Sequence, residues 1–188
     1  CLIEEPIPLG PRGDFKPVYS GWMPYGRVFD NVWCGRRHAM VTPVQLDQWG
    51  QANISCLGDF KKPKVQMLGV RGFPGNSMNH ANSFFVPNHN TKVFVEGEVD
   101  MVASAGYNSA RLARGWRLED IDIRLIVTNL GVLDFGGPGR QVRLFSVHPG
   151  VTPDQVQQAT GFPLHLPDRI PTTATPTAGQ LALIQRLH

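Results

Sequence analysis

The stretch IDIRLIVTNLGVLDF, residues 121–135, decides the fold class of this chain of 188 residues. Its crowded aliphatic side chains are typical of a buried strand. The glycines and Pro138 that follow predict a turn at residues 134–139, and residues 142–147 alternate as the returning strand of a hairpin would. We therefore expect a sheet with this hairpin as part of it.

Further helices and strands alternate along the rest of the chain. We expect one helix that ends near Gly35 and one over residues 76–85. Two further helices are expected to begin at the capping patterns of Thr152 and Thr177. We expect short strands over residues 39–41 with a continuation at 44–46, over 65–70 and over 92–96. Residues 106–120 are expected to be irregular with one short helix, and residues 47–53 to turn with Gly50 at positive φ. The mixture predicts an α/β protein with a mixed sheet.

The length and composition predict one domain, residues 1–188, in which the proline-rich segment 163–176 connects to a C-terminal helix. Hydrophobic residues make up 41% and charged residues 18% of the chain, which argues against disorder. Residues 1–20 contain many prolines and are expected to be an extended connector. The chain does not begin with Met, and we expect an N-terminal segment before Cys1.

Charge and cysteine usage limit the partners and the compartment. The net charge is +3, and the basic and acidic residues are interspersed, so we predict no nucleic-acid partner. No run of about 18 apolar residues occurs, so we predict no membrane span. Cys1, Cys34 and Cys56 form no paired spacing, which fits a reducing compartment. With no signal segment in view, we predict a cytoplasmic protein.

The segment GVRGFPGN, residues 69–76, is the best candidate for a functional site. It follows a predicted strand and opens a predicted helix, so its glycines let the backbone approach a ligand closely. Arg71 is placed to hold a carboxylate, a thioester oxygen or a phosphate; the alternative is a tight turn with Arg71 paired to a neighbouring carboxylate. The candidate substrate-binding residues of the loop are Gly69, Gly72, Phe73, Gly75 and Asn76.

Asn79 and His80 extend this candidate site along the following helix. Asn76 and His80 are four residues apart and share a helix face. His80 can polarise a carbonyl or move a proton, or it is a structural histidine. The remaining histidines have no metal-ligand spacing, so we predict no metal site.

The sequence resembles the β subunits of family I CoA-transferases. The motifs that carry the resemblance are residues 45–53 (QLDQWGQAN), 69–76, 127–135 (VTNLGVLDF), 146–152 (SVHPGVT) and 159–163 (ATGFP). The branch most similar is that of the β subunits of actinobacterial cholesterol ring-cleaving CoA hydrolases, on residues 21–29 (GWMPYGRVF), 35–38 (GRRH), 69–72 (GVRG) and 135–138 (FGGP). Among true transferases, the glutaconate CoA-transferases are the nearest.

The resemblance implies a three-layer mixed-sheet fold of the NagB/RpiA/CoA-transferase type and an α2β2 assembly with an α subunit. It implies an acyl-CoA substrate, with coenzyme A as part of the substrate and no permanently bound cofactor. In the hydrolases an α-subunit carboxylate is the base. For this chain we predict Arg71 as the catalytic residue, which stabilises the oxyanion or enolate together with N–H groups of the loop. Asn53 is expected to orient the acyl end.

Three functions stay open on the sequence. The first is a hydrolase that opens a cyclic β-diketone ring of a steroid-derived CoA ester. The second is a true CoA-transferase, whose nucleophilic Glu would lie in a Glu-Ser-Gly or Glu-Asn-Gly motif before Cys1. The third is a ligand-binding member of the fold without catalytic activity.

Overall fold

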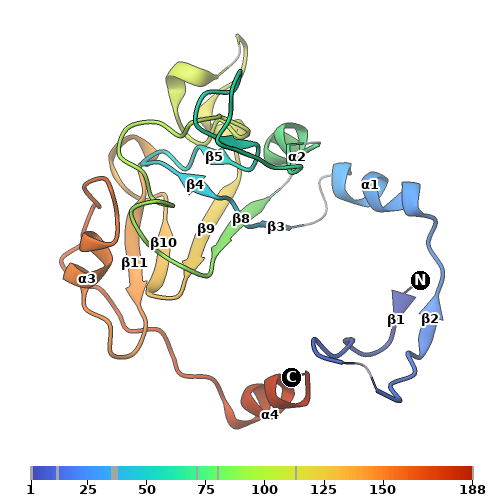
Figure 1. The fold of residues 1–188 in the computed structure, drawn as a ribbon. Helices are drawn as coiled ribbons and strands as arrows, with labels where there is room; N and C mark the ends of the chain where they lie inside the picture. The colour runs from blue at the N-terminus through green and yellow to red at the C-terminus, as the bar shows by residue number, and fades with distance from the viewer. Residues whose placement is uncertain are drawn as a thin grey trace. The chain divides into compact units, whose positions relative to one another are not determined.

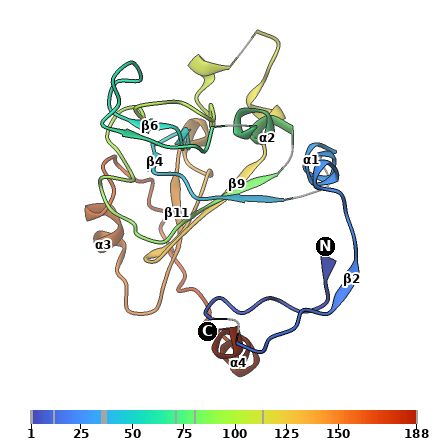
Figure 2. The same cartoon turned by 45° about the vertical axis from the view of Figure 1, so that its right-hand side comes forward.

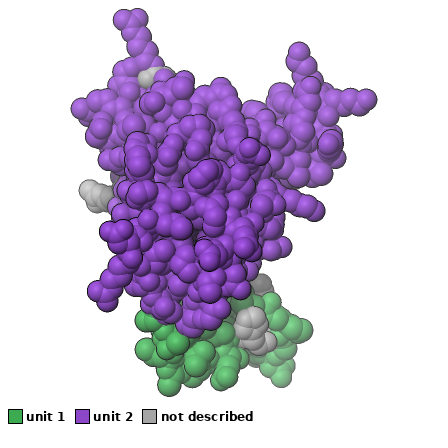
Figure 3. All heavy atoms as spheres, turned by 90° about the vertical axis from the view of Figure 1, so that its left-hand side faces the viewer, with its two compact units in different colours: residues 1–31, 174–188 green, residues 32–173 purple. Residues whose placement is uncertain are grey.

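The computed structural model describes residues 2–11, 13–34, 38–70, 72–79, 81–112 and 114–187, with the backbone alone for residues 29, 32 and 33. Its contacts divide the chain into two units, residues 1–31 with 174–188 and residues 32–173 (Figure 3). Among the described residues, every helix is too short or too polar to span a bilayer.

A five-stranded mixed sheet forms the centre of residues 32–173 (Figure 1). Its strands in spatial order are β11 (Arg143–Val147), β10 (Gly131–Asp134), β9 (Ile123–Thr128), β8 (Asn82–Val86) and β3 (Ala39–Val41). β3, β8 and β9 run parallel, while β10 is antiparallel to both of its neighbours. This is the mixed sheet that the sequence predicts.

One row of side chains across the sheet forms the core. Phe84 lies beside Ile126, Ile126 beside Leu133 and Leu133 beside Leu144, and all four are fully buried. Each such side chain stabilises the fold by about 1.5–3 kcal/mol relative to exposure. Leu125, on the opposite face of β9, is 36% exposed.

The stretch 121–135 forms two strands of a hairpin, so the expectation of one continuous strand was wrong. The hydroxyl oxygen of Thr128 accepts hydrogen bonds from the backbone N–H groups of Leu130 and Gly131, each at 3.1 Å, which closes a tight turn. A Cβ at position 131 would lie 2.4 Å from the carbonyl oxygen of Ser146, so only glycine fits there. The returning strand β11 is confirmed.

Residues 76–85 are helical only at their start, since α2 spans Phe73–Asn79 and β8 begins at Asn82. Pairing with strands on both sides overrides the helical pattern of residues 82–85. The predicted strand over residues 92–96 was also wrong: it makes one isolated bridge, Leu46 with Phe94. The predicted strand 65–70 is shorter, with β7 at Val65–Gln66 paired to β6 (Cys56–Leu57).

The remaining elements of this unit follow the predictions more closely. β4 (Gln45–Leu46) pairs with β5 (Ala52–Asn53) across the predicted turn, where Gly50 has φ +71°. Residues 106–120 contain two short 3-10 helices, η1 (Ser109–Arg111) and η2 (Leu118–Asp120), and a third, η3, spans Pro138–Arg140. α3 (Pro153–Gln158) begins at Thr152, whose capping box with Gln155 is formed as predicted.

The other unit contains both ends of the chain. β1 (Leu2–Ile3) pairs with β2 (Tyr19–Gly21), so the expected extended connector contains a short strand pair. α4 (Ala178–Leu187) is confirmed, with Thr177 and Gln180 forming the predicted capping contacts. α1 spans Tyr25–Trp33, in agreement with the predicted helix. The single domain over residues 1–188 stays a prediction.

Candidate active site

The glycine loop lies against the end of β5, because Gly69 packs directly on the backbone of Ile54. A Cβ at position 69 would lie 2.8 Å from the Ile54 carbonyl oxygen. Gly72 has φ +75°, a conformation that side chains rarely adopt. Both glycines are therefore required by the path of the loop, which brings Gly69 next to Ile54.

α2 continues the loop and lies at the edge of the sheet where β3, β8 and β9 begin (Figures 1 and 2). Phe73 is 3% exposed and belongs to the core, so it anchors the first turn. Gly75 and Asn79 are exposed. The Asn76 carbonyl oxygen accepts a hydrogen bond from Asn82 Nδ2 at 3.1 Å, which ties α2 to β8.

The two residues predicted to carry the chemistry of this segment, Arg71 and His80, lie outside the described residues. Their neighbours define where they attach to the fold. Val70 packs against the core, and Gly72 is exposed.

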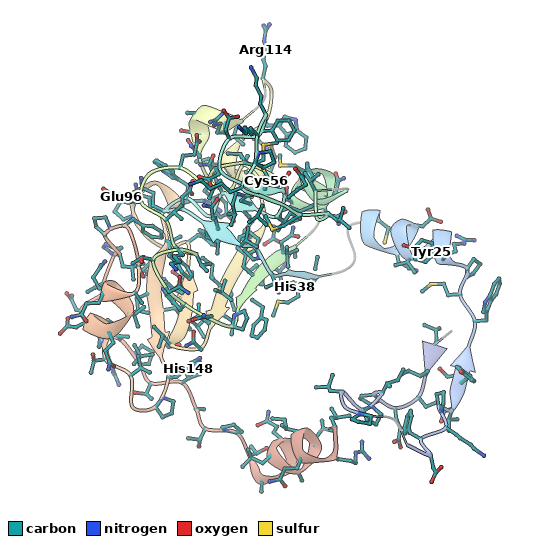
Figure 4. All side chains as sticks on the ribbon, viewed as in Figure 1. Tyr25, His38, Cys56, Glu96, Arg114 and His148 are labelled. Atoms are coloured by element: carbon teal, nitrogen blue, oxygen red, sulfur yellow. The ribbon has the colours of Figure 1, made fainter. Side chains whose placement is uncertain are left out.

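Asn53 lies in a buried polar cluster. Its Nδ2 donates to Gln45 Oε1 and to the Cys56 carbonyl oxygen, both at 2.7 Å. Its Oδ1 accepts from the Ser55 N–H at 2.9 Å. Asn53 is fully buried, and Figure 4 shows Cys56 within the dense cluster of side chains in this region. The amide of Asn53 thus holds the turn after β5, on which Gly69 rests.

A pocket of about 310 Å³ lies against α2, on the side of residues 102–105. Its lining residues are Pro74, Ser77, Met78, Val102, Ala103, Ala105 and Arg111. Most are apolar, and of the described residues that line the pocket, Arg111 alone carries a charge. The volume is at the lower end of the range for small-molecule sites.

A chain of hydrogen bonds runs from Arg111 into the protein. Arg111 donates from Nε to Glu98 Oε1 at 2.9 Å and from Nη2 to Glu98 Oε2. Glu98 Oε1 also accepts from Gln51 Nε2 at 3.1 Å, and the same Nε2 donates to Asp47 Oδ2. Gln51 Oε1 accepts from Asn108 Nδ2 at 3.3 Å. The Gln51 amide therefore bridges two carboxylates.

The two carboxylates of this chain differ in protonation. Burial raises the pKa of Asp47 to about 6, against hydrogen bonds from Gln51 and Trp49 that lower it. The Arg111 hydrogen bonds hold the pKa of Glu98 below its usual range. Glu98 therefore stays charged near neutral pH and forms an ion pair with the charged Arg111, while Asp47 changes its charge close to pH 6.

Sequence reasoning missed Glu98 and Arg111 and treated Asp47 only as a turn residue. Asp47 does make the turn, since Oδ1 accepts from the N–H groups of Trp49 and Gln51. The signal for its second role was the polar residues Gln45, Asp47 and Gln51 placed among buried apolar ones. Glu98 and Arg111 are thirteen residues apart in an irregular region and gave no signal.

Comparison with known proteins supplies relatives for this fold and site. No family model matches the chain. The cholesterol ring-cleaving hydrolase IpdB subunit of Mycobacterium tuberculosis (strain H37Rv) is 46% identical over 184 residues, which cover 98% of this chain and 72% of the relative.

Two solved structures match as well. The crystal structure of IpdAB from Rhodococcus jostii RHA1 has a TM-score of 0.81 and 40% identity, and the match covers 92% of this chain and 69% of that chain. Glutaconate coenzyme A-transferase from Acidaminococcus fermentans has a TM-score of 0.74 at 24% identity, and the match covers 87% of this chain and 65% of that chain. This likeness concerns the fold alone. The chain has the fold of a CoA-transferase subunit and belongs to the family of the IpdB subunits of cholesterol ring-cleaving hydrolases.

Proposed function

We propose that the chain is the β subunit of a heteromeric hydrolase that opens a cyclic β-diketone ring of a steroid-derived CoA ester. The observation that carries this proposal is the 46% identity to named IpdB subunits over 98% of the chain. The match covers nearly the whole chain, including the glycine loop and the elements that support it. An α subunit is the proposed partner, in an α2β2 assembly with the active site between subunits.

The proposed reaction adds one water molecule and breaks one carbon–carbon bond. A carboxylate of the α subunit takes a proton from water, whose oxygen bonds to a ring carbonyl carbon. The bond between this carbon and the neighbouring ring carbon then breaks, which leaves a carboxylic acid on one side and an enolate on the other. Protonation of the enolate completes the ring opening, while the CoA thioester is retained.

Arg71 is the catalytic residue that we assign to this chain. A guanidinium in a glycine-rich loop stabilises the negative oxygen that develops as water adds and as the enolate forms. Gly69, Gly72, Gly75 and Asn76 shape the same loop, with Gly69 held against Ile54. Asn79 and His80, which follow the loop in sequence, are also proposed to bind the substrate.

Two of the residues proposed for substrate binding act from the interior of the protein. Phe73 anchors α2 in the core, and Asn53 holds the backbone on which Gly69 rests. In this proposal both position the loop. The substrate is a CoA ester, with no permanently bound cofactor, and the enzyme acts in the cytoplasm.

A mass-spectrometric assay tests the proposed function. The chain, co-purified with its α subunit, is incubated with a cyclic-diketone CoA thioester, with and without acetate or succinate. The hydrolase gives a ring-opened product that has gained one water and kept its CoA, whether or not the acid is present. Transfer of CoA to the added acid would overturn the proposal in favour of a CoA-transferase.

A further inference from the structure

The pocket beside α2 combines apolar walls with one cationic group. Pro74 and Met78 of α2 form one wall, and residues 102–105 form the other. Pro74 is three residues from Arg71, so the pocket adjoins the glycine loop. Such a pocket suits a ligand that has an apolar body and an anionic end, because a carboxylate or phosphate is otherwise costly to remove from water.

Arg111 is held in place and still has hydrogen-bond donors to offer. A guanidinium has five N–H groups, and the paired hydrogen bonds to Glu98 use one on Nε and one on Nη2. The Arg111 side chain is half exposed and lines the pocket. An anion in the pocket would meet a group whose orientation is already fixed, so little conformational entropy is lost on binding.

The support behind Arg111 reaches the buried part of the protein. Glu98 is held by Gln51, and Gln51 is fully buried and bonded to Asp47 and Asn108. Several arginine–carboxylate pairs among the described residues are local surface pairs, such as Arg124 with Asp122, two residues apart. The Arg111 pair instead joins segments thirteen residues apart and continues inward. The hydrogen bonds behind Arg111 thus fix its orientation, as a binding residue requires.

We propose that Arg111 binds an anionic oxygen group of the CoA ester, with the apolar part of the ligand lying between α2 and residues 102–105. This inference rests on the proposed function, because it takes a CoA ester as the ligand. Two sources of the anion share this chemistry: a carboxylate at the far end of the acyl group and the 3′-phosphate of coenzyme A. The test separates them.

The experiment measures equilibrium binding to the heteromer by calorimetry and does not depend on turnover. The acyl pair is glutaryl-CoA and pentanoyl-CoA, which differ by a terminal carboxylate; the second pair is coenzyme A and dephospho-coenzyme A. The variant is Arg111→Gln. The matched control is Arg114→Gln, which removes the same charge from a side chain of the same loop that points away from the protein (Figure 4).

Arg111→Gln is expected to weaken binding of the ligand that carries the recognised anion by 10- to 100-fold, as for loss of a charge-assisted hydrogen bond. The dissociation constant of the ligand that lacks this anion should change by less than about twofold. The Arg114→Gln variant should bind both ligands like the wild type. The pair that shows the difference identifies the anion as the acyl carboxylate or the 3′-phosphate.

Two results would overturn the inference. One is an equal effect of Arg111→Gln on both members of each pair. The other needs no variant: wild-type affinities that are the same with and without the carboxylate and with and without the 3′-phosphate. If the wild-type heteromer binds none of these CoA compounds, the proposed function itself fails. This result is distinct from a failure of the Arg111 inference alone.

Discussion

Glu98 accepts two hydrogen bonds from Arg111, with Nε to Oε1 at 2.9 Å, and Oε1 is shared with Gln51. The ion pair on the pocket wall is therefore continuous with a buried carboxylate, Asp47, through one amide group. The amide donates one hydrogen to each carboxylate. This relationship makes Gln51 the residue on which the order of the pocket wall depends.

Gln51→Leu is expected to lower the free energy of unfolding by about 3 kcal/mol. The substitution keeps the volume but leaves Asp47 Oδ2 without its donor in a fully buried position and removes a donor from Glu98. Urea unfolding followed by circular dichroism measures the change. Gln158→Leu, at an exposed position of α3, is the control and should shift stability by less than about 0.5 kcal/mol. Equal effects of the two variants would contradict the role given to Gln51.

Asp47 and His89 should oppose each other in the dependence of stability on pH. The pKa of Asp47 is raised from 3.8 to about 6, so the folded state binds the extra proton and stability falls as pH rises from about 4 to 6. Burial lowers the pKa of His89 from 6.5 to about 4, so the unfolded state binds the extra proton and stability rises over the same range. Each contribution amounts to at most about 3 kcal/mol, and in the wild type they largely cancel.

Two variants separate these contributions in calorimetric scans of the heteromer between pH 4 and 7. Relative to the wild type, Asp47→Asn should gain stability as pH rises, and His89→Gln should lose it. The part of each stability difference from the wild type that does not change with pH reflects lost hydrogen bonds, such as that between His89 Nε2 and Thr160 Oγ1 at 2.9 Å. Curves that stay parallel to the wild type would show that neither group titrates in this window.

Gly69→Ala is expected to reduce turnover at least tenfold, because the new methyl group would lie 2.8 Å from the Ile54 carbonyl oxygen and displace the loop. Gly179→Ala, in α4, is the matched control: nothing lies within 4 Å of the added carbon, and it should be neutral or slightly stabilising. Steady-state kinetics of both variants provide the comparison. Wild-type turnover in Gly69→Ala would mean that the position of the loop does not matter for the reaction.

Arg71→Ala is expected to lower turnover by about 10²–10³, the usual cost of removing one donor to a developing oxyanion. The heteromer should still assemble, which size-exclusion chromatography checks. Arg71→Lys keeps the charge without the planar donor pair and should retain part of the activity. Turnover of the alanine variant at the wild-type level would exclude Arg71 as a catalytic residue.

The elements that local sequence defines were predictable. The capping box of Thr152 and the capping contacts of Thr177 depend on residues three apart, and the positive φ of Gly50 on turn chemistry. The hairpin within residues 121–135 was missed because its turn is closed by the Thr128 hydroxyl and by the close approach of Gly131 to Ser146. β8 was missed because its strand character comes from two parallel neighbours distant in sequence.

The candidate site was predictable in part for the same reason. The glycine loop is continuous in sequence and was visible as a strand–loop–helix pattern. The pocket wall needed Arg111, Glu98 and Gln51 together, and three segments of the chain supply them. No spacing rule joins these positions, since several strands and α2 lie between Gln51 and Glu98 and an irregular segment lies between Glu98 and Arg111.

Ring opening in H₂¹⁸O is the decisive test of the proposed reaction. The heteromer is incubated with the cyclic-diketone CoA thioester in labelled water, and the product is examined by fragmentation in the mass spectrometer. The proposed reaction gives one ¹⁸O atom in the new carboxyl group, formed where the ring bond broke, with the CoA thioester intact. Release of free coenzyme A with ¹⁸O in the thioester-derived carboxyl group, and an unopened ring, would contradict it.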